Sequence, residues 1–388
     1  MDFGASPQGP ESMVRLLALL AFLAATAVSA AAPQPKIGHV FVIVLENENF
    51  RTTFGPESVA PYLARDLPAQ GALLDHYYGI GHFSLDNYLA MISGQAPNPV
   101  TQDDCGDFTD FVMTGTARDG QAIGQGCVYP ASVKTLADQM DEKKLRWHGY
   151  MEDMGKDPSR EPARCGHPAI GAPDGTQSAT PSDKYATRHN PFVYFHSIID
   201  RPSCAENVVP LDGLESDLAS LEHTANLTFI TPNLCNDGHD SECADGGPGG
   251  LVAADAFLRH WVPLILASPA YRQDGLLIIT FDEADVPDPS QATDNFDACC
   301  NEQPGPNIAA GHIVDKRADS GPGISGAGGG RTGAVLLSPF IKPGTVTTTP
   351  YNHYAMLRSL EDFFGLGHLG YAGQKGLKTF GKDVFTAP

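Results

Sequence analysis

Acidic and amide side chains follow three apolar, β-rich segments of the chain. The segments are 39–45 (HVFVIVL), 227–231 (LTFIT) and 276–281 (LLIITF). The polar residues that follow them are Glu46 and Asn47, then Asp237, His239 and Asp240, and finally Asp282 and Glu283. Ligands bind beyond the carboxyl ends of strands in open α/β sheets, so these groups are expected to meet at one sheet edge. Carboxylates packed that closely need a cation to offset their repulsion, and the pattern predicts a metal site.

The expected ligands are mostly oxygen atoms, with one or two imidazoles available. Such a set suits one hard or borderline divalent ion, namely Mg, Mn, Ca or Zn, and the residue types do not choose among them. The alternative is that these acids are solvated turn residues, as Asp and Glu often are. That alternative explains a single strand end more readily than three together.

A second informative stretch is 81–94 (GHFSLDNYLAMISG), where Ser84 stands at the start of a predicted helix over 84–92. Free amides and the helix dipole favour an anion there, so the helix itself would hold a phosphoryl group attacked by Ser84. Asn87, one turn later, would reach a phosphate oxygen. A hydroxyl is a weak nucleophile unless a base or metal activates it, and the acidic groups would supply that metal. Alternatively, Ser84 is an ordinary helix N-cap.

Strand-like and helix-like segments alternate along the chain. Strands are predicted at 39–45, 72–78, 227–231, 276–281 and 335–337, and helices at 60–70, 84–92, 253–267 and 354–364. This order predicts a doubly wound α/β sandwich with a mostly parallel sheet and helices on both faces. Two long segments, 98–130 and 286–330, interrupt it, and loops of that length often shape a site.

The N-terminal segment 1–32 has a short apolar run that ends in small residues, which is typical of a signal peptide. We therefore expect a secreted or periplasmic protein formed by one domain over 33–388, with no transmembrane anchor after signal removal. The formal net charge is −21. Such a surface repels nucleic acid at long range, so nucleic-acid binding is not expected.

Eight cysteines are present, which in an exported protein favours disulfides. Their pairing cannot be read from the sequence. The adjacent Cys299 and Cys300 are expected to pair with other cysteines rather than with each other.

The segment HVFVIVLENENFRTTFG, from His39 onward, resembles the opening of the bacterial phosphoesterase family that includes secreted acid phosphatases and phosphocholine-type phospholipases C. The Ser84 segment also resembles the nucleophile segment of the wider alkaline phosphatase superfamily, in which Ser or Thr precedes an Asn by three residues. The acid phosphatase branch fits best, because PYLARDLPAQGALL, WHGYMEDM, KYATRHNPFVYF, TPNLCNDGHD and YNHYAMLRSLEDFFGL are similar to its blocks, in order. The ENENF motif lacks the arginine common in the phospholipase branch.

The resemblance implies an alkaline phosphatase-like fold and roles for particular residues. It implies that Ser84 attacks phosphorus through a phosphoserine intermediate and that His239 protonates the leaving oxygen. The implied metal ligands are Glu46, Asn47, Ser84, Asp282 and Glu283. The implied substrate-binding residues are Asn87, Lys184, His189, Asp237, Asp240 and His353.

These features together predict a secreted, metal-dependent acid phosphatase that hydrolyses phosphate monoesters. Its partner would be a small phosphate ester or a phospholipid head group. One alternative is a phosphodiesterase or phospholipase C, whose apolar or aromatic cage would lie in the loops at 98–130 and 286–330. Another is an exported metal-binding module without turnover.

Overall fold

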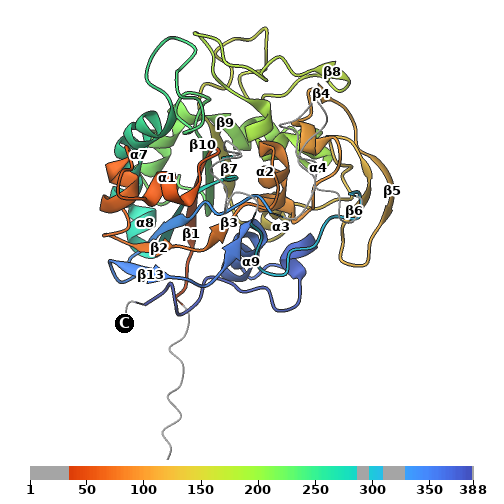
Figure 1. Ribbon diagram of the computed structural model, residues 1–388. Coiled ribbons are helices and arrows are strands. Elements are labelled where there is room, and N and C mark those ends of the chain that lie inside the picture. The colour runs from red at the N-terminus through yellow and green to blue at the C-terminus, as the bar shows by residue number, and fades with distance from the viewer. Residues whose placement is uncertain (1–34, 286–296, 309–327, 387–388) are drawn as a thin grey trace, which may run out of the picture. The chain divides into compact units, whose positions relative to one another are not determined.

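The computed structural model describes residues 35–285, 297–308 and 328–386 (Figure 1). The predicted signal peptide at 1–32 and most of the predicted loop at 286–330 lie outside these residues. Residues Gln34–Pro388 form one compact unit.

An eight-stranded sheet lies at the centre of this unit, in the order β13-β2-β12-β11-β1-β10-β7-β9. Its strands are β1 (His39–Leu45), β2 (Ala72–Leu74), β7 (Trp147–Met151), β9 (Val208–Pro210), β10 (Leu227–Thr231), β11 (Gly275–Phe281), β12 (Ala334–Leu337) and β13 (Thr345–Thr347). β1 runs parallel to both of its neighbours, β10 and β11. β12 pairs antiparallel with β11 and β2, and the remaining pairs are parallel. The predicted α/β class with a mostly parallel sheet is confirmed.

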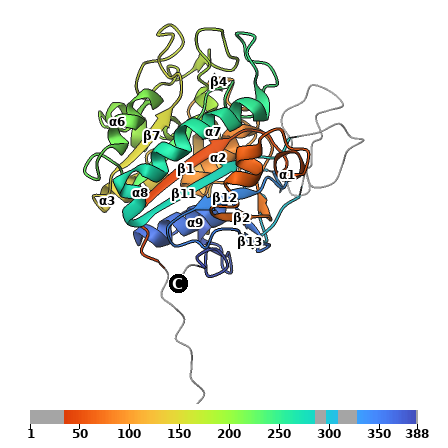
Figure 2. The same ribbon diagram turned by 90° about the vertical axis from the view of Figure 1, so that its left-hand side faces the viewer.

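Helices cover both faces of the sheet because alternate side chains of β1 point to opposite sides. Val40, Val42 and Val44 pack with α2 (Ser84–Ser93), α3 (Leu136–Glu142) and α9 (His353–Phe364). Phe41, Ile43 and Leu45 pack with α7 (Gly250–Ala267) and α8 (Pro269–Asp274). Figure 2 shows α7 and α8 lying across the face that carries this second cluster. The two hydrophobic layers hold the strand ends at fixed positions.

α7 is, among the described residues, the one helix long and apolar enough to cross a membrane by length and composition. Its apolar side nevertheless lies on the sheet, where Leu251, Ala254 and Phe257 are buried in the second cluster. Asp255 of the same helix accepts a hydrogen bond from the Leu63 amide at 2.9 Å. These contacts make α7 a core helix of the sandwich.

Two predicted elements differ from the structure. The helix predicted at 60–70 is a short π-helix, η1 (Tyr62–Asp66), which begins directly after Pro61. The strand predicted at 72–78 divides into β2 and β3 (Tyr77–Tyr78). β3 pairs with β14 (Tyr351–Asn352) instead of joining the main sheet, and the Tyr351 amide donates to the His76 carbonyl at the break.

The predicted loop at 98–130 contains ordered structure. It includes η2 (Thr101–Asp103), β4 (Asp107–Phe108) and the hairpin of β5 (Val112–Thr116) and β6 (Ala122–Gln125). The remaining elements are α1 (Phe50–Phe54), β8 (Ala172–Pro173), η3 (Thr187–His189), η4 (Pro191–Tyr194), α4 (His196–Ile199), α5 (Cys204–Asn207), η5 (Leu211–Gly213), α6 (Leu214–Leu218) and η8 (Gly370–Gly373).

All eight cysteines form disulfides. The pairs are Cys105–Cys127, Cys165–Cys204, Cys235–Cys243 and Cys299–Cys300. The expectation that Cys299 and Cys300 pair outward was wrong. The other six cysteines pair among themselves, so these two have no partner but each other.

Removal of the Cys165–Cys204 disulfide by Cys165→Ser with Cys204→Ser should lower the free energy of unfolding by about 2–4 kcal/mol. This bond joins residues 39 positions apart, so its loss frees a long loop in the unfolded chain. Urea denaturation would measure the change. The matched pair Cys235→Ser with Cys243→Ser, which spans 8 positions, should cost less. A larger loss from the shorter loop would contradict the loop-entropy explanation.

Candidate active site

The structure brings three strand ends together at one edge of the sheet. Leu45, the last residue of β1, is in register with Phe281, the last residue of β11. The Asp282 amide donates to the Leu45 carbonyl at 2.9 Å, and the Glu46 amide donates to the Asp237 carbonyl at 2.9 Å. The residues that follow β1, β10 and β11 therefore form a single cluster.

Ser84 is the first residue of α2 and lies against this cluster. Its Oγ donates to Glu46 Oε2 at 2.7 Å, and the residue is 5% exposed. The alternative that Ser84 is an N-cap is wrong, because Phe83 occupies the cap position with φ 93°. Glu283 holds this unusual backbone, since its two carboxylate oxygens accept from the Phe83 amide at 3.1 and 3.2 Å. The Ser84 hydroxyl is thereby turned toward Glu46.

The N-terminus of α2 already has an anion supplied by the chain. Asp104 Oδ1 accepts from the Leu85 amide at 3.0 Å. The Leu85 amide is therefore already used by Asp104 and is not available to hold a phosphoryl group, which is the role that the sequence had predicted for the first amides of this helix. Burial raises the pKa of Asp104 to about 6.

Asn87 braces the turn that precedes Ser84. Its Oδ1 accepts from the amides of Ile80 and Gly81 at 2.8 and 3.3 Å. Its Nδ2 donates to the carbonyls of Gly81 and Phe83 at 2.9 and 3.2 Å. Because the side-chain amide is buried and engaged with backbone at both ends, this geometry gives Asn87 a positioning role.

Glu46 is fully buried and accepts hydrogen bonds on both of its carboxylate oxygens. Besides the Ser84 hydroxyl it accepts the Tyr88 hydroxyl on Oε1 at 2.6 Å. Burial raises its pKa well above the ordinary 4.5, and repulsion from Asp282 and Asp237 adds to the increase. Burial and the neighbouring Glu283 likewise raise the pKa of Asp282. A cation would relieve these electrostatic costs.

Three oxygens of the cluster have unused capacity to bind a ligand. Asn47 Oδ1, Asp237 Oδ2 and Asp282 Oδ2 are buried and have no hydrogen-bond partner. Within residues 35–285, 297–308 and 328–386, no three His, Cys, Asp or Glu side chains could hold a metal ion by themselves. A cation here would therefore depend on the Asn47 amide oxygen and the Ser84 hydroxyl, beside the carboxylates of Glu46 and Asp282. Oxygen donors of this kind fit a hard divalent ion.

His189 is buried between two acids of the cluster. Its Nε2 lies 3.4 Å from Glu46 Oε2, and its Nδ1 lies 3.9 Å from Asp237 Oδ2. The ring stacks on Tyr88 with centroids 5.4 Å apart. Burial lowers the pKa of His189 and raises that of Asp237 to about 7. The imidazole is thus part of the wall behind Glu46.

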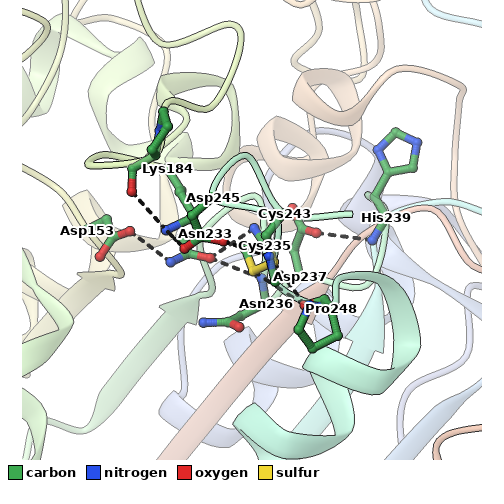
Figure 3. Close-up of a disulfide and its surroundings, with 12 residues drawn as sticks. Asp153, Lys184, Asn233, Cys235, Asn236, Asp237, His239, Cys243, Asp245 and Pro248 are labelled. Atoms are coloured by element: carbon green, nitrogen blue, oxygen red, sulfur yellow. Dashed lines mark hydrogen bonds and ion pairs between the residues drawn. A yellow bond between two sulfur atoms is a disulfide. The ribbon is translucent and has the colours of Figure 1, made fainter. Parts of the chain in front are cut away.

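His239 lies on a loop that several contacts fix in place (Figure 3). The Cys235–Cys243 disulfide closes this loop, and Asp237 Oδ1 accepts from the His239 amide at 3.1 Å. Lys184 Nζ lies 3.0 Å from Asp245 Oδ2, so it ties the loop from outside. Figure 3 shows the His239 ring pointing away from these contacts. Asp240, the next residue, is exposed.

His353 lies behind the cluster and is fully buried. Its Nε2 contacts the Asp282 carbonyl, and its Nδ1 lies 3.1 Å from the Tyr77 hydroxyl. Burial lowers its pKa to about 4. The geometry makes His353 a support for the end of β11.

A cavity of about 310 Å³ opens onto Ser84. Its walls include four residues singled out from the sequence, namely Asn47, Ser84, His239 and Glu283. They also include five that were not, namely His82, Phe83, Asp104, Gln177 and Arg188. His82 lies in the nucleophile segment 81–94, two residues before Ser84, and that position was the signal that could have found it. In the structure its Nδ1 pairs with Glu283. Arg188 adjoins His189 in the segment KYATRHNPFVYF, and that position was the signal that could have found it.

A model of the Phosphoesterase family matches residues 56–367. An acid phosphatase of Aspergillus fumigatus is 26% identical over 243 residues, which cover 63% of this chain and 44% of that protein. A phosphate-repressible acid phosphatase of Penicillium chrysogenum is 26% identical over 328 residues, covering 84% of this chain and 59% of that protein. The chain thus spans about half the length of these fungal relatives. A phosphatidylinositol-3-phosphatase of Mycobacterium tuberculosis is 23% identical over 369 residues and is covered to 91%.

Solved structures give more distant likenesses. A protein of the alkaline phosphatase superfamily from Vibrio parahaemolyticus has a TM-score of 0.48 and 12% identity, covering 91% of this chain and 72% of that chain. Murine ectonucleotide pyrophosphatase/phosphodiesterase 5 has a TM-score of 0.46 and 8% identity, covering 85% and 96%. The α/β architecture itself rests on the strand order and helix layers of this chain.

Proposed function

This chain belongs to the Phosphoesterase family, and on that premise we propose that it is a secreted, metal-dependent acid phosphatase acting on phosphate monoesters through a phosphoserine intermediate. One observation carries the proposal. The Ser84 hydroxyl opens onto a cavity while its proton points to Glu46 Oε2, 2.7 Å away. Relatives named acid phosphatase support the reaction class. Four disulfides support export.

The residues that would hold the metal ion are Glu46, Asn47, Ser84 and Asp282. When bound, a divalent ion (Mg, Mn, Ca or Zn) would lower the pKa of the serine hydroxyl and neutralise charge on a phosphoryl oxygen. Glu283 would join this set only by giving up a contact to His82, Phe83 or Asn47. We therefore assign Glu283 first to positioning the Ser84 backbone.

The residues of the site divide the reaction into two chemical steps. Ser84 Oγ attacks phosphorus, and its proton passes along the hydrogen bond to Glu46 Oε2 as the Oγ–P bond forms. The ester P–O bond breaks, and His239 at the cavity wall would give the leaving oxygen a proton. Water then attacks the phosphorus of phosphoserine, and one of its protons returns to His239. The Oγ–P bond breaks and Oγ takes back the proton held by Glu46, which releases phosphate and restores the serine hydroxyl.

The proposed reaction leaves several classes of phosphate ester as candidate substrates. The mycobacterial relative, which this chain matches along most of its length, is named phosphatidylinositol-3-phosphatase. A phosphate monoester on a lipid head group is therefore the first large substrate to test. Among the described cavity residues, Phe83 supplies the one ring that is not a histidine, so these residues form no aromatic cage for the second ester group of a diester.

Chelation should abolish the release of p-nitrophenol from p-nitrophenyl phosphate, with a fall of at least ~100-fold, because the orphaned oxygens of Asn47 and Asp282 lose their cation. Adding Mg, Mn, Ca or Zn separately to the chelated protein should identify the ion that restores turnover. The bis(p-nitrophenyl) ester and p-nitrophenylphosphorylcholine should react little.

Other outcomes would redirect the assignment. Turnover that is insensitive to chelation would remove the metal from the mechanism. Reaction of the diesters alone would make the protein a phosphodiesterase or phospholipase, and reaction of no ester would favour a non-catalytic metal-binding module.

A further inference from the structure

Arg188 carries the one permanent positive charge among the described residues that line the cavity around Ser84. It lies in η3, directly before His189, and its side chain is 12% exposed. A guanidinium stays protonated at any physiological pH. The charge is therefore held at the cavity wall, where a phosphoryl group attacked by Ser84 has to sit.

The protein uses only part of the hydrogen-bonding capacity of Arg188. Nη1 donates to the Gln177 carbonyl at 3.0 Å, and Nε lies 3.8 Å from Asp104 Oδ2, which is an ion pair too long for a hydrogen bond. Nη2 makes no hydrogen bond to any described residue. Neither Nε nor Nη2 is a buried group without a partner, so these donors face the cavity, where the oxygens of an anion would be suitable acceptors.

Arg160 shows what a purely structural arginine of this chain looks like. Its Nε donates to the Gly175 carbonyl at 3.1 Å and its Nη2 donates to the Ser178 carbonyl at 2.7 Å. Its Nη1 donates to the Asp183 carbonyl at 2.7 Å and lies 3.1 Å from the Asp183 carboxylate. All three nitrogens of Arg160 thus have protein partners within hydrogen-bond distance, whereas in Arg188 only Nη1 has one.

Asp104 fixes Arg188 relative to the nucleophile. One carboxylate oxygen of Asp104 accepts from the Leu85 amide, next to Ser84, and the other faces Arg188. Gln177 completes the frame, because its Nε2 donates to the Asp104 carbonyl at 3.0 Å while its own carbonyl accepts from Arg188. The guanidinium and the Ser84 hydroxyl are thus held in one rigid unit.

We propose that Arg188 binds the phosphoryl oxygens of the substrate and of the phosphate product, and that it favours monoesters over diesters. This inference rests on the proposed phosphatase function. A planar guanidinium matches two oxygens of one phosphate group. A monoester presents three terminal oxygens and up to two charges, whereas a diester presents two oxygens and one charge. The carboxylates of Asp104 and Glu283 in the same wall make a positive group necessary for a dianion.

Arg188→Gln should raise both the KM for p-nitrophenyl phosphate and the inhibition constant of inorganic phosphate by about 10- to 100-fold, the range for losing hydrogen bonds to a charged group. Arg188→Lys should restore only part of the affinity, because an ammonium keeps the charge without the planar fork. Arg160→Lys is the matched control. It should lower the melting temperature and leave phosphate inhibition unchanged.

An unchanged phosphate inhibition constant in a folded Arg188→Gln or Arg188→Lys protein would overturn the proposal. Direct calorimetric titration of the full chain with inorganic phosphate separates this result from failure of the phosphatase assignment. If the wild type hydrolyses no ester but binds phosphate, and Arg188→Lys weakens that binding, Arg188 is a phosphate ligand and the proposed function fails. If the wild type hydrolyses the monoester but binds no phosphate, the phosphatase assignment stands and the role of Arg188 is overturned.

Discussion

Ser84→Ala is expected to reduce phosphate monoester hydrolysis by ~10⁴-fold or more, because it removes the attacking oxygen while the rest of the cluster remains. The substitution removes one small buried group, and Glu46 keeps its hydrogen bond from the Tyr88 hydroxyl. The fold should therefore survive. Initial rates with p-nitrophenyl phosphate would measure the loss. Mass spectrometry of acid-quenched wild type should find a phosphoryl group on the peptide that contains Ser84.

Ser93→Ala provides a matched control on the same helix. Ser93 is also buried, but its hydroxyl donates to the Leu89 carbonyl and makes no contact with Glu46. This variant should retain near wild-type turnover with a comparable change in stability. Retention of more than a tenth of the activity by Ser84→Ala, or a phosphoryl group on another residue, would remove Ser84 from the nucleophile role.

The central strands could be predicted from the sequence because burial on both faces leaves a continuous apolar run. HVFVIVL and LTFIT give β1 and β10 with the bounds that the structure has. β7 was missed since its sequence, WHGYM, has His148 and Gly149 in the middle. Gly149 is needed there because a Cβ would meet the Phe192 ring at 2.7 Å, a tertiary contact that no local pattern reveals.

The strand-end part of the site could be predicted for a related reason. Residues directly after parallel strands share one sheet edge, so Glu46, Asn47 and Asp282 follow from local sequence and topology alone. Asp104 and Arg188 could not be predicted in this way. They come from a long loop and a single 3₁₀ turn, and their position depends on contacts such as that of Asp104 with the Leu85 amide.

Side-chain direction was the other feature that the sequence left open. Asn87 belongs to the nucleophile segment, and His353 lies next to Asp282. Their polar atoms, however, bind the backbone of residues 80–83 and the Asp282 carbonyl. In these two residues the polar atoms satisfy buried backbone groups, which are costly to leave without a partner.

Glu46→Gln is expected to lower activity by at least ~100-fold. Loss of a residue that only supports a metal ligand costs up to ~100-fold, and loss of a ligand itself should cost more. Glu46 accepts hydrogen bonds from the Ser84 hydroxyl at 2.7 Å and from the Tyr88 hydroxyl at 2.6 Å. An amide has one acceptor oxygen, so one of these hydroxyls loses its partner. The matched control is Glu57→Gln at an exposed position, which should change neither activity nor stability.

The same Glu46→Gln substitution should stabilise the metal-free protein as the pH rises. Burial, then repulsion from Asp282 and Asp237, raises the pKa of Glu46 above the ordinary 4.5. The folded state therefore holds this proton more tightly than the unfolded state, and the wild type loses stability as the pH rises above 4.5. Glutamine does not titrate, so its advantage in melting temperature should be absent at lower pH and grow above it.

Thermal unfolding in chelator across this pH range would measure that advantage. Adding the metal back should make the wild type the more stable of the two proteins, because the ion stabilises most the folded protein that binds it more tightly. A variant that is less stable than the wild type at every pH without metal would contradict this account. If Glu46→Gln is inactive but more stable than the wild type without metal, then the Glu46 carboxylate serves the metal ion and not the fold. Burial of this carboxylate among like charges opposes folding.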